Sequence, residues 1–136
     1  MNEPILGKLE PHGFDYTPIT WDNFLKIRNA AKIAANNIGY PIYLVGSSLT
    51  KNIPRDIDIS IIIPLNDYEK MFGVLPTKQD DMCEYLTNVW NNTFEKIEDL
   101  HFCLFETYHL DIKICPDNWW VDKDKMLLAA PDNKNI

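Results

Sequence analysis

In the segment Tyr43–Pro64, "YLVGSSLTKNIPRDIDISIIIP", two aspartates fall inside a run that otherwise predicts a buried strand. Successive side chains of a strand point to opposite faces of its sheet. Asp56 and Asp58 are therefore expected to share one face. The opposite face, turned toward a core, is expected to carry every second residue of the run: Ile57, Ile59, Ile61 and Ile63.

The paired aspartates predict a bound cation. Two residues of strand rise place the starts of their side chains roughly 6–7 Å apart. Like charges at this separation repel, and each disfavours the ionised form of the other. A cation between them removes the repulsion, and Mg²⁺ prefers hard oxygen ligands from one or two carboxylates together with substrate phosphates. The alternative interpretation is the solvated face of a sheet.

A third aspartate occurs in a later strand-like run, "HLDIKIC" at 109–115. Leu110, Ile112 and Ile114 form its apolar face, and Asp111 and Lys113 fall on the other. If the two strands are neighbours in one sheet, Asp111 converges with the two earlier aspartates. Three carboxylates can hold two divalent metals about 3.5–4 Å apart, the arrangement used for in-line phosphoryl or nucleotidyl displacement.

A glycine-serine turn follows the first short apolar run of the segment. Gly46 lets the backbone approach a phosphate closely. The amides and hydroxyls of Ser47 and Ser48 can donate to phosphate oxygens, as at other turns that follow a strand. A Gly-Ser turn alone is often only a turn, so the prediction of an anion site depends on its combination with the aspartates.

In this combination the chain resembles the polymerase-beta-like nucleotidyltransferase superfamily, of the minimal single-domain type. The resemblance covers about Trp21 to Cys115 and lacks the second, helical domain of larger members. It rests on three motifs: Val45-Gly46-Ser47, Asp56-Ile57-Asp58-Ile59, and Leu110-Asp111-Ile112.

The resemblance implies two Mg²⁺ ions, with Mn²⁺ as an alternative, and transfer of a nucleoside monophosphate from an NTP to an acceptor. ATP is the expected NTP. Gly46 and Ser47 would meet the β- and γ-phosphates. Asp56 and Asp58 would ligate both metals, and Asp111 would ligate the catalytic metal and help activate the acceptor hydroxyl. The candidate cations for the triphosphate are Lys51, Arg55 and Lys113.

The order of elements predicts an α+β domain of two layers, with a mixed sheet flanked by helices. Residues 1–19 are expected to form an extended arm, 20–130 a single domain and 131–136 a disordered tail. Thr20 is the expected N-cap of the first helix, and Gly39 ends it. A second capping box is expected at Thr77 and Asp80. The expected helices are 21–37, one turn at 68–72, a helix from this box to 97, and one at 122–130; the expected strands are 42–45, 57–63 and a hairpin of 102–106 with 109–115.

Composition restricts the class of protein. No run of eighteen apolar residues is present, which excludes a membrane-spanning helix, and no signal peptide is recognised. Three cysteines without a CxxC pair are expected to be reduced thiols in the cytoplasm. The net charge of −7 disfavours an extended nucleic-acid surface.

Three functions stay open. The acceptor of a transferase could be a protein, a small molecule or an RNA end, and a partner protein or a homodimer could complete the site. The second function is a catalytically silent module that binds nucleotides or a partner on the same fold. The third is a pure interaction protein that docks through its proline-containing arm.

Overall fold

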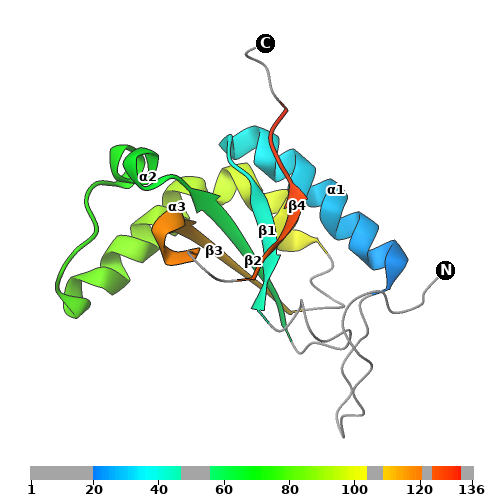
Figure 1. Ribbon diagram of the computed structural model, residues 1–136. Helices are drawn as coiled ribbons and strands as arrows, with labels where there is room; N and C mark the ends of the chain where they lie inside the picture. The colour runs from blue at the N-terminus through cyan, green and yellow to red at the C-terminus, as the bar shows by residue number, and fades with distance from the viewer. Residues whose placement is uncertain (1–19, 47–55, 104–108, 121–123, 133–136) are drawn as a thin grey trace, which may run out of the picture.

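The computed structural model describes residues 20–46, 56–103, 109–120 and 124–132, and at positions 56, 109 and 120 it describes the backbone alone. These residues form an α+β fold of a mixed sheet and a layer of helices (Figure 1), as the sequence predicts. The elements are α1 Trp21–Ile38, β1 Ile42–Val45, β2 Asp56–Ile63, α2 Leu65–Phe72, α3 Gln79–Phe102, β3 His109–Pro116, the 3₁₀ helix η2 Asp117–Trp120, and β4 Met126–Ala129.

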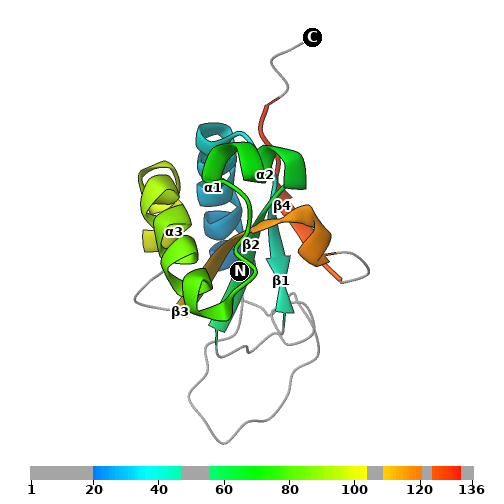
Figure 2. The same ribbon diagram turned by 90° about the vertical axis from the view of Figure 1, so that its left-hand side faces the viewer.

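The strands are ordered β3-β2-β1-β4 across the sheet. β1 is antiparallel to both of its neighbours, whereas β2 and β3 are parallel. A parallel pair needs a long crossover connection, which α2 and α3 provide. Helices α1 and α3 pack against each other, and both lie on the same face of the sheet (Figure 2).

The alternation predicted for β2 is confirmed on the face toward these helices. Each of the four alternate isoleucines is at most 1% exposed: Ile57, Ile59, Ile61 and Ile63. The opposite face is less open than the sequence suggests, because Ser60 and Ile62 are buried there as well. Among the β2 side chains described on this face, Asp58 is partly accessible.

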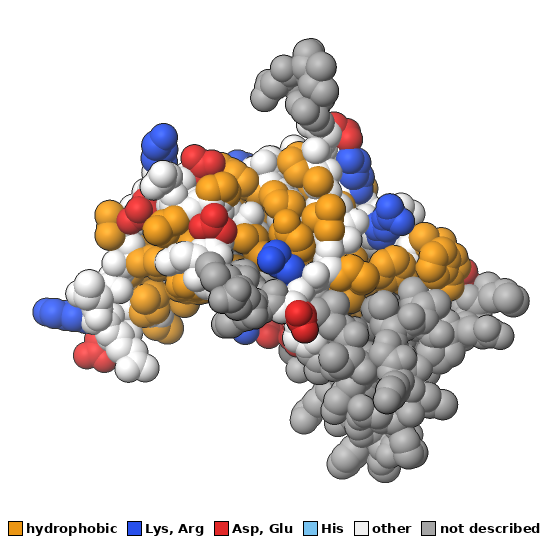
Figure 3. All heavy atoms as spheres, in the orientation of Figure 1, with side chains coloured by type: hydrophobic (Ala, Val, Ile, Leu, Met, Phe, Trp, Pro, Cys, Tyr) orange, Lys and Arg blue, Asp and Glu red, His pale blue; other side chains and the backbone are white. Residues whose placement is uncertain are grey.

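The open face of the sheet is partly apolar. Leu127 of β4 is exposed, and Lys125 lies with its Nζ 5.7 Å from the ring centroid of Tyr43 on β1. Figure 3 shows hydrophobic side chains gathered over the middle of this face, with isolated charged side chains among them.

The predicted ends of α1 are confirmed to within one residue. The Thr20 side chain accepts a hydrogen bond from the Asn23 amide at 3.2 Å, which satisfies one of the unpaired donors at the helix start. Gly39 has a φ of 87° and donates its N–H to the Ala35 carbonyl, so it ends the helix in the left-handed conformation typical of glycine.

The predicted capping box of α3 and the predicted end of this helix are wrong. The helix begins at Gln79 with Lys78 as its N-cap, and no side chain caps it, so the predicted box at Thr77 and Asp80 does not form. The helix also continues past Ile97 to Phe102. The reason is that its apolar stripe continues: Leu100 is fully buried, and the Phe102 ring lies 6.0 Å from that of Phe94.

The longer helix also changes the predicted hairpin. Phe102 ends α3 and Cys103 is its C-cap, so these two residues are not part of a strand. Residues 104–106 lie outside the described residues. Within the described residues, β3 pairs with β2 in parallel.

Two further elements differ from the prediction. α2 is eight residues long and starts at Leu65, whereas the prediction was a single turn that starts near Tyr68. The helix predicted at 122–130 is wrong: Met126–Ala129 is the strand β4, paired with β1. The run Met-Leu-Leu-Ala has no alternation that distinguishes a helix from a strand, and the unpaired edge of β1 decides in favour of a strand.

The residues after β4 contact α1. Asp132, expected in the disordered tail, accepts hydrogen bonds from the side chains of Lys32 and Asn36. Its amide also donates to the Asn36 side chain at 2.8 Å. The arm at 1–19 and the last residues, 133–136, lie outside the described part of the chain.

Tyr68 of α2 is fully buried and ties this helix to the sheet. Its ring lies 5.0 Å from the Phe72 ring, and burial raises the pKa of its phenol, so the hydroxyl stays protonated and donates to the Ile114 carbonyl at 3.4 Å. We expect Tyr68→Ala to lower the free energy of unfolding by about 3–5 kcal/mol, because the ring leaves a cavity. Tyr68→Phe should cost less than about 1 kcal/mol, since this hydrogen bond is long. Urea denaturation measures both, and an equal loss in the two variants would contradict the assignment to packing.

Candidate functional site

The pairing of β2 with β3 places Asp58 opposite Asp111. The two residues are Cα partners in a parallel pair, and neighbouring strands lie about 4.8 Å apart. Cα partners present their side chains on the same face of a sheet. The two strands are thus neighbours, which was the condition for Asp111 to approach the earlier aspartates, although the residues are distant in the sequence.

Asp56 is the first residue of β2, and its Cα partner is His109. Its side chain lies outside the described part of the structure. Among the side chains that are described, no group of three His, Cys, Asp or Glu residues converges as metal ligands would. The cluster of three carboxylates therefore stays a prediction, of which the structure describes the pair Asp58 and Asp111.

Gly46 follows β1 and lies against the carboxylate of Asp58. Val45 is the Cα partner of Asp58, which brings the next residue beside this side chain. Gly46 has a φ of 68°, and a Cβ placed on it would lie 2.5 Å from Asp58 Oδ2. Glycine is needed here both for the conformation and for the space. Sequence reasoning predicted close approach at Gly46 but assigned it to a phosphate rather than to Asp58.

One small cavity joins these residues. Its volume is about 140 Å³, and β1, β2 and β3 all contribute to its wall. It is lined by Val45, Gly46, Asp58, Ile59, Ser60, Asp111 and Lys113. Four predicted site residues thus line one cavity: Gly46, Asp58, Asp111 and the cation Lys113.

Among the described residues that line this cavity, the charged ones are Asp58, Asp111 and Lys113. Lys113 Nζ lies 3.9 Å from Asp111 Oδ2, and the two side chains are 70% and 46% exposed. An ion pair this open to water contributes little stability. Like charges at directly opposite positions on neighbouring strands destabilise a sheet. A divalent cation between Asp58 and Asp111 would reduce the repulsion between the two carboxylates.

Ser60 is a member of the cavity wall that the sequence analysis missed. It is fully buried, its Cα partner on β3 is Lys113, and within the described structure its Oγ has no hydrogen-bond partner. A buried hydroxyl without a partner costs roughly 1–3 kcal/mol. The signal in the sequence was a single hydroxyl residue within the apolar run Ile57–Ile63.

The remaining predicted site residues lie outside the described ranges: Ser47, Ser48, Lys51 and Arg55. Their assignment to the phosphates stays a prediction. In the chain they lie between Gly46, which follows β1, and β2, which carries Asp58.

Comparisons with protein families, with curated protein sequences and with solved structures found no match to this chain. Within the described residues, none of the helices combines the length and the apolar character that crossing a membrane requires.

Proposed function

We propose that this chain is a Mg²⁺-dependent nucleotidyltransferase, which moves a nucleoside monophosphate from an NTP to an acceptor. The observation that supports this most is the pair of carboxylates, Asp58 and Asp111, on adjacent parallel strands in one cavity with Lys113. A purely structural sheet face gains nothing from opposed like charges. ATP is the proposed donor, and the acceptor is a protein, a small molecule or an RNA end.

The donor set fits divalent metal ions. Asp58 and Asp111 offer hard oxygen ligands from neighbouring strands, and Asp56, two positions before Asp58, would add a third. Gly46 leaves room for one of these carboxylates against the backbone, which a larger residue would displace. Two bound ions would neutralise charge on the triphosphate and lower the pKa of the acceptor hydroxyl.

In the proposed reaction the acceptor oxygen forms a bond to the α-phosphorus of the NTP. The bond from this phosphorus to the bridging oxygen of the β-phosphate breaks, and pyrophosphate leaves with the electron pair. The acceptor proton passes to the Asp111 carboxylate or to water. Lys113, which is mostly exposed beside Asp111, would bind the phosphate oxygens, together with the predicted cations Lys51 and Arg55.

Transfer of label from each NTP tests this function. The protein is incubated with Mg²⁺ or Mn²⁺, each labelled NTP and a cell lysate, beside a variant with both Asp56→Ala and Asp58→Ala. The proposal expects label on a macromolecule or small molecule with the wild type only. If calorimetry detects NTP binding but the wild type transfers no label, the chain is the silent binding module instead.

Mg²⁺ itself should stabilise the protein through Asp111. A ligand present at ten times its Kd adds about 1.4 kcal/mol to the free energy of unfolding, which for a domain of this size raises the Tm by roughly 3–6 °C. We expect this rise in the wild type and its loss in Asp111→Asn. Without Mg²⁺, Asp111→Asn should unfold at the same Tm or a higher one, because the opposed charges are removed. Differential scanning fluorimetry measures both, and an equal Mg²⁺ effect in the two proteins would argue against this site.

A further inference from the structure

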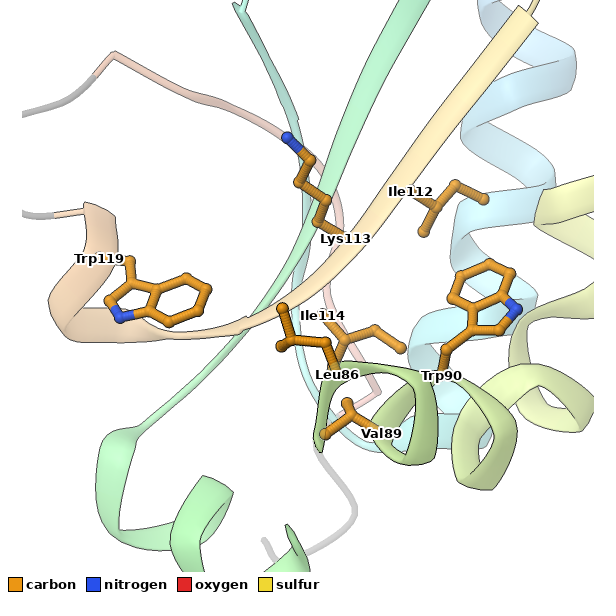
Figure 4. Close-up of a pocket in the computed structure, with 7 residues that line it drawn as sticks. All are labelled: Leu86, Val89, Trp90, Ile112, Lys113, Ile114 and Trp119. Carbon is orange, nitrogen blue, oxygen red and sulfur yellow. The ribbon is translucent and has the colours of Figure 1, made fainter. Parts of the chain in front are cut away.

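A second cavity, which we term the edge groove, lies next to the proposed triphosphate site. It has a volume of about 210 Å³ and runs between α3, β3 and η2 (Figure 4). α3 contributes Leu86, Val89 and Trp90, β3 contributes residues 112–114, and η2 contributes Trp119. Apart from Lys113, no residue of this groove has a role in the proposed function.

The lining of the edge groove suits a flat, largely apolar ring. Small-molecule sites are mostly apolar with a few polar groups that fix orientation, and here Lys113 is the charged residue of the lining. Trp119 and Trp90 stand at opposite ends of the groove, with Leu86 between them (Figure 4). Trp119 is 38% exposed, and an aromatic ring of this size can stack on another flat ring.

Lys113 connects the two cavities, because it lines both. On β3, Asp111 and Lys113 belong to the cavity of the carboxylates, whereas Ile112 and Ile114 belong to the edge groove. The two cavities open on opposite faces of the sheet at its β3 edge, so a nucleotide that occupies both passes around this edge strand.

β3 is also at the edge of the sheet as far as the structure describes it, since it pairs with β2 alone. An edge strand presents backbone N–H and C=O groups without a strand partner. The Ile114 carbonyl already accepts a hydrogen bond from the Tyr68 hydroxyl. Other backbone groups along this edge can form hydrogen bonds with the polar edge of a ring that stacks in the groove. A nucleobase combines a flat face with such a polar edge.

We infer that the edge groove binds the base of the NTP whose triphosphate lies at Asp58 and Asp111. The inference rests on the proposed function and adds the element that recognises the nucleoside. Trp119 stacks on the base, and the edge of β3 binds the polar atoms of the base. Lys113 lies between the base and the phosphates of the nucleotide. A purine covers more of the indole than a pyrimidine does, so the groove favours purine nucleotides.

Calorimetry with two ligands tests the subsite: Mg²⁺-ATP, and Mg²⁺-tripolyphosphate, which has no base. We expect the wild type to bind ATP more tightly than tripolyphosphate. Stacking of a base on an aromatic side chain contributes about 1–3 kcal/mol, so Trp119→Ala should weaken ATP binding about 5–150-fold. The affinity for tripolyphosphate should not change, and Trp119→Phe should recover most of the ATP affinity.

Two further variants make the test specific. Trp21→Ala removes another exposed tryptophan, on α1 and outside the groove lining, and should leave both affinities unchanged. Leu86→Trp fills the groove and should weaken ATP binding without affecting tripolyphosphate. If tripolyphosphate binds but neither Trp119→Ala nor Leu86→Trp weakens ATP, the base lies elsewhere and only this inference fails. If the wild type binds neither ligand, the proposed function fails and the inference fails with it.

Discussion

Replacing Asp58 by Asn is expected to reduce nucleotidyl transfer by at least about 100-fold. Losing a residue that only supports a metal ligand already costs 10–100-fold, and Asp58 is proposed to be a ligand itself. Asn keeps the shape of the side chain but removes the charge that holds a divalent cation opposite Asp111. Release of pyrophosphate and transfer of label from ATP measure the rate.

The matched control is Asp99→Asn, which removes the same charge from an exposed position on α3. It should retain the wild-type rate, and both variants should give the wild-type far-UV circular dichroism spectrum. An Asp58→Asn protein that keeps more than a tenth of the wild-type rate would show that this carboxylate is not a metal ligand of the reaction.

Replacing Gly46 by Ala is expected to damage stability and activity together. A non-glycine residue in the left-handed conformation costs about 1–2 kcal/mol, and Gly46 has a φ of 68°. The new Cβ would also lie 2.5 Å from Asp58 Oδ2, so the carboxylate must move away from Asp111 or the end of β1 must shift. We expect a loss of about 2–4 kcal/mol in the free energy of unfolding, and the same loss of transfer as in Asp58→Asn.

Gly39→Ala separates the two causes. Gly39 has a φ of 87°, but no atom lies within 4 Å of the position of its Cβ. It should therefore lose only the conformational part, about 1–2 kcal/mol, and keep full activity. Urea denaturation and the transfer assay compare the two variants. Equal effects of Gly39→Ala and Gly46→Ala on stability would mean that contact with Asp58 is unimportant.

The features that depend on neighbouring residues in the chain were predictable. The alternation in Ile57–Ile63 gave the buried face of β2, because the two-residue period of a strand is a local property. The start of α1 at Thr20 and its end at Gly39 were predictable for the same reason, since capping depends on a side chain and a backbone conformation at one position.

The errors occurred where local patterns are ambiguous. The segment Phe102–Glu106 has strand-like residues, but Phe102 continues the apolar stripe of α3 and remains helical. Met126–Ala129 is apolar at every position, so its sequence cannot distinguish a helix from a strand. Its pairing with β1 decides the conformation, and this pairing depends on a strand far away in the chain.

Alternation along each strand was enough to predict that Asp58 and Asp111 lie opposite an apolar face. Only the tertiary structure decided that they are partners, that Gly46 contacts Asp58, and that Ser60 is buried beside them. The physical reason is register. A shift of β3 by one residue would turn Ile112 and Ile114 away from the helices, so packing of the core fixes the alignment that places Asp111 opposite Asp58.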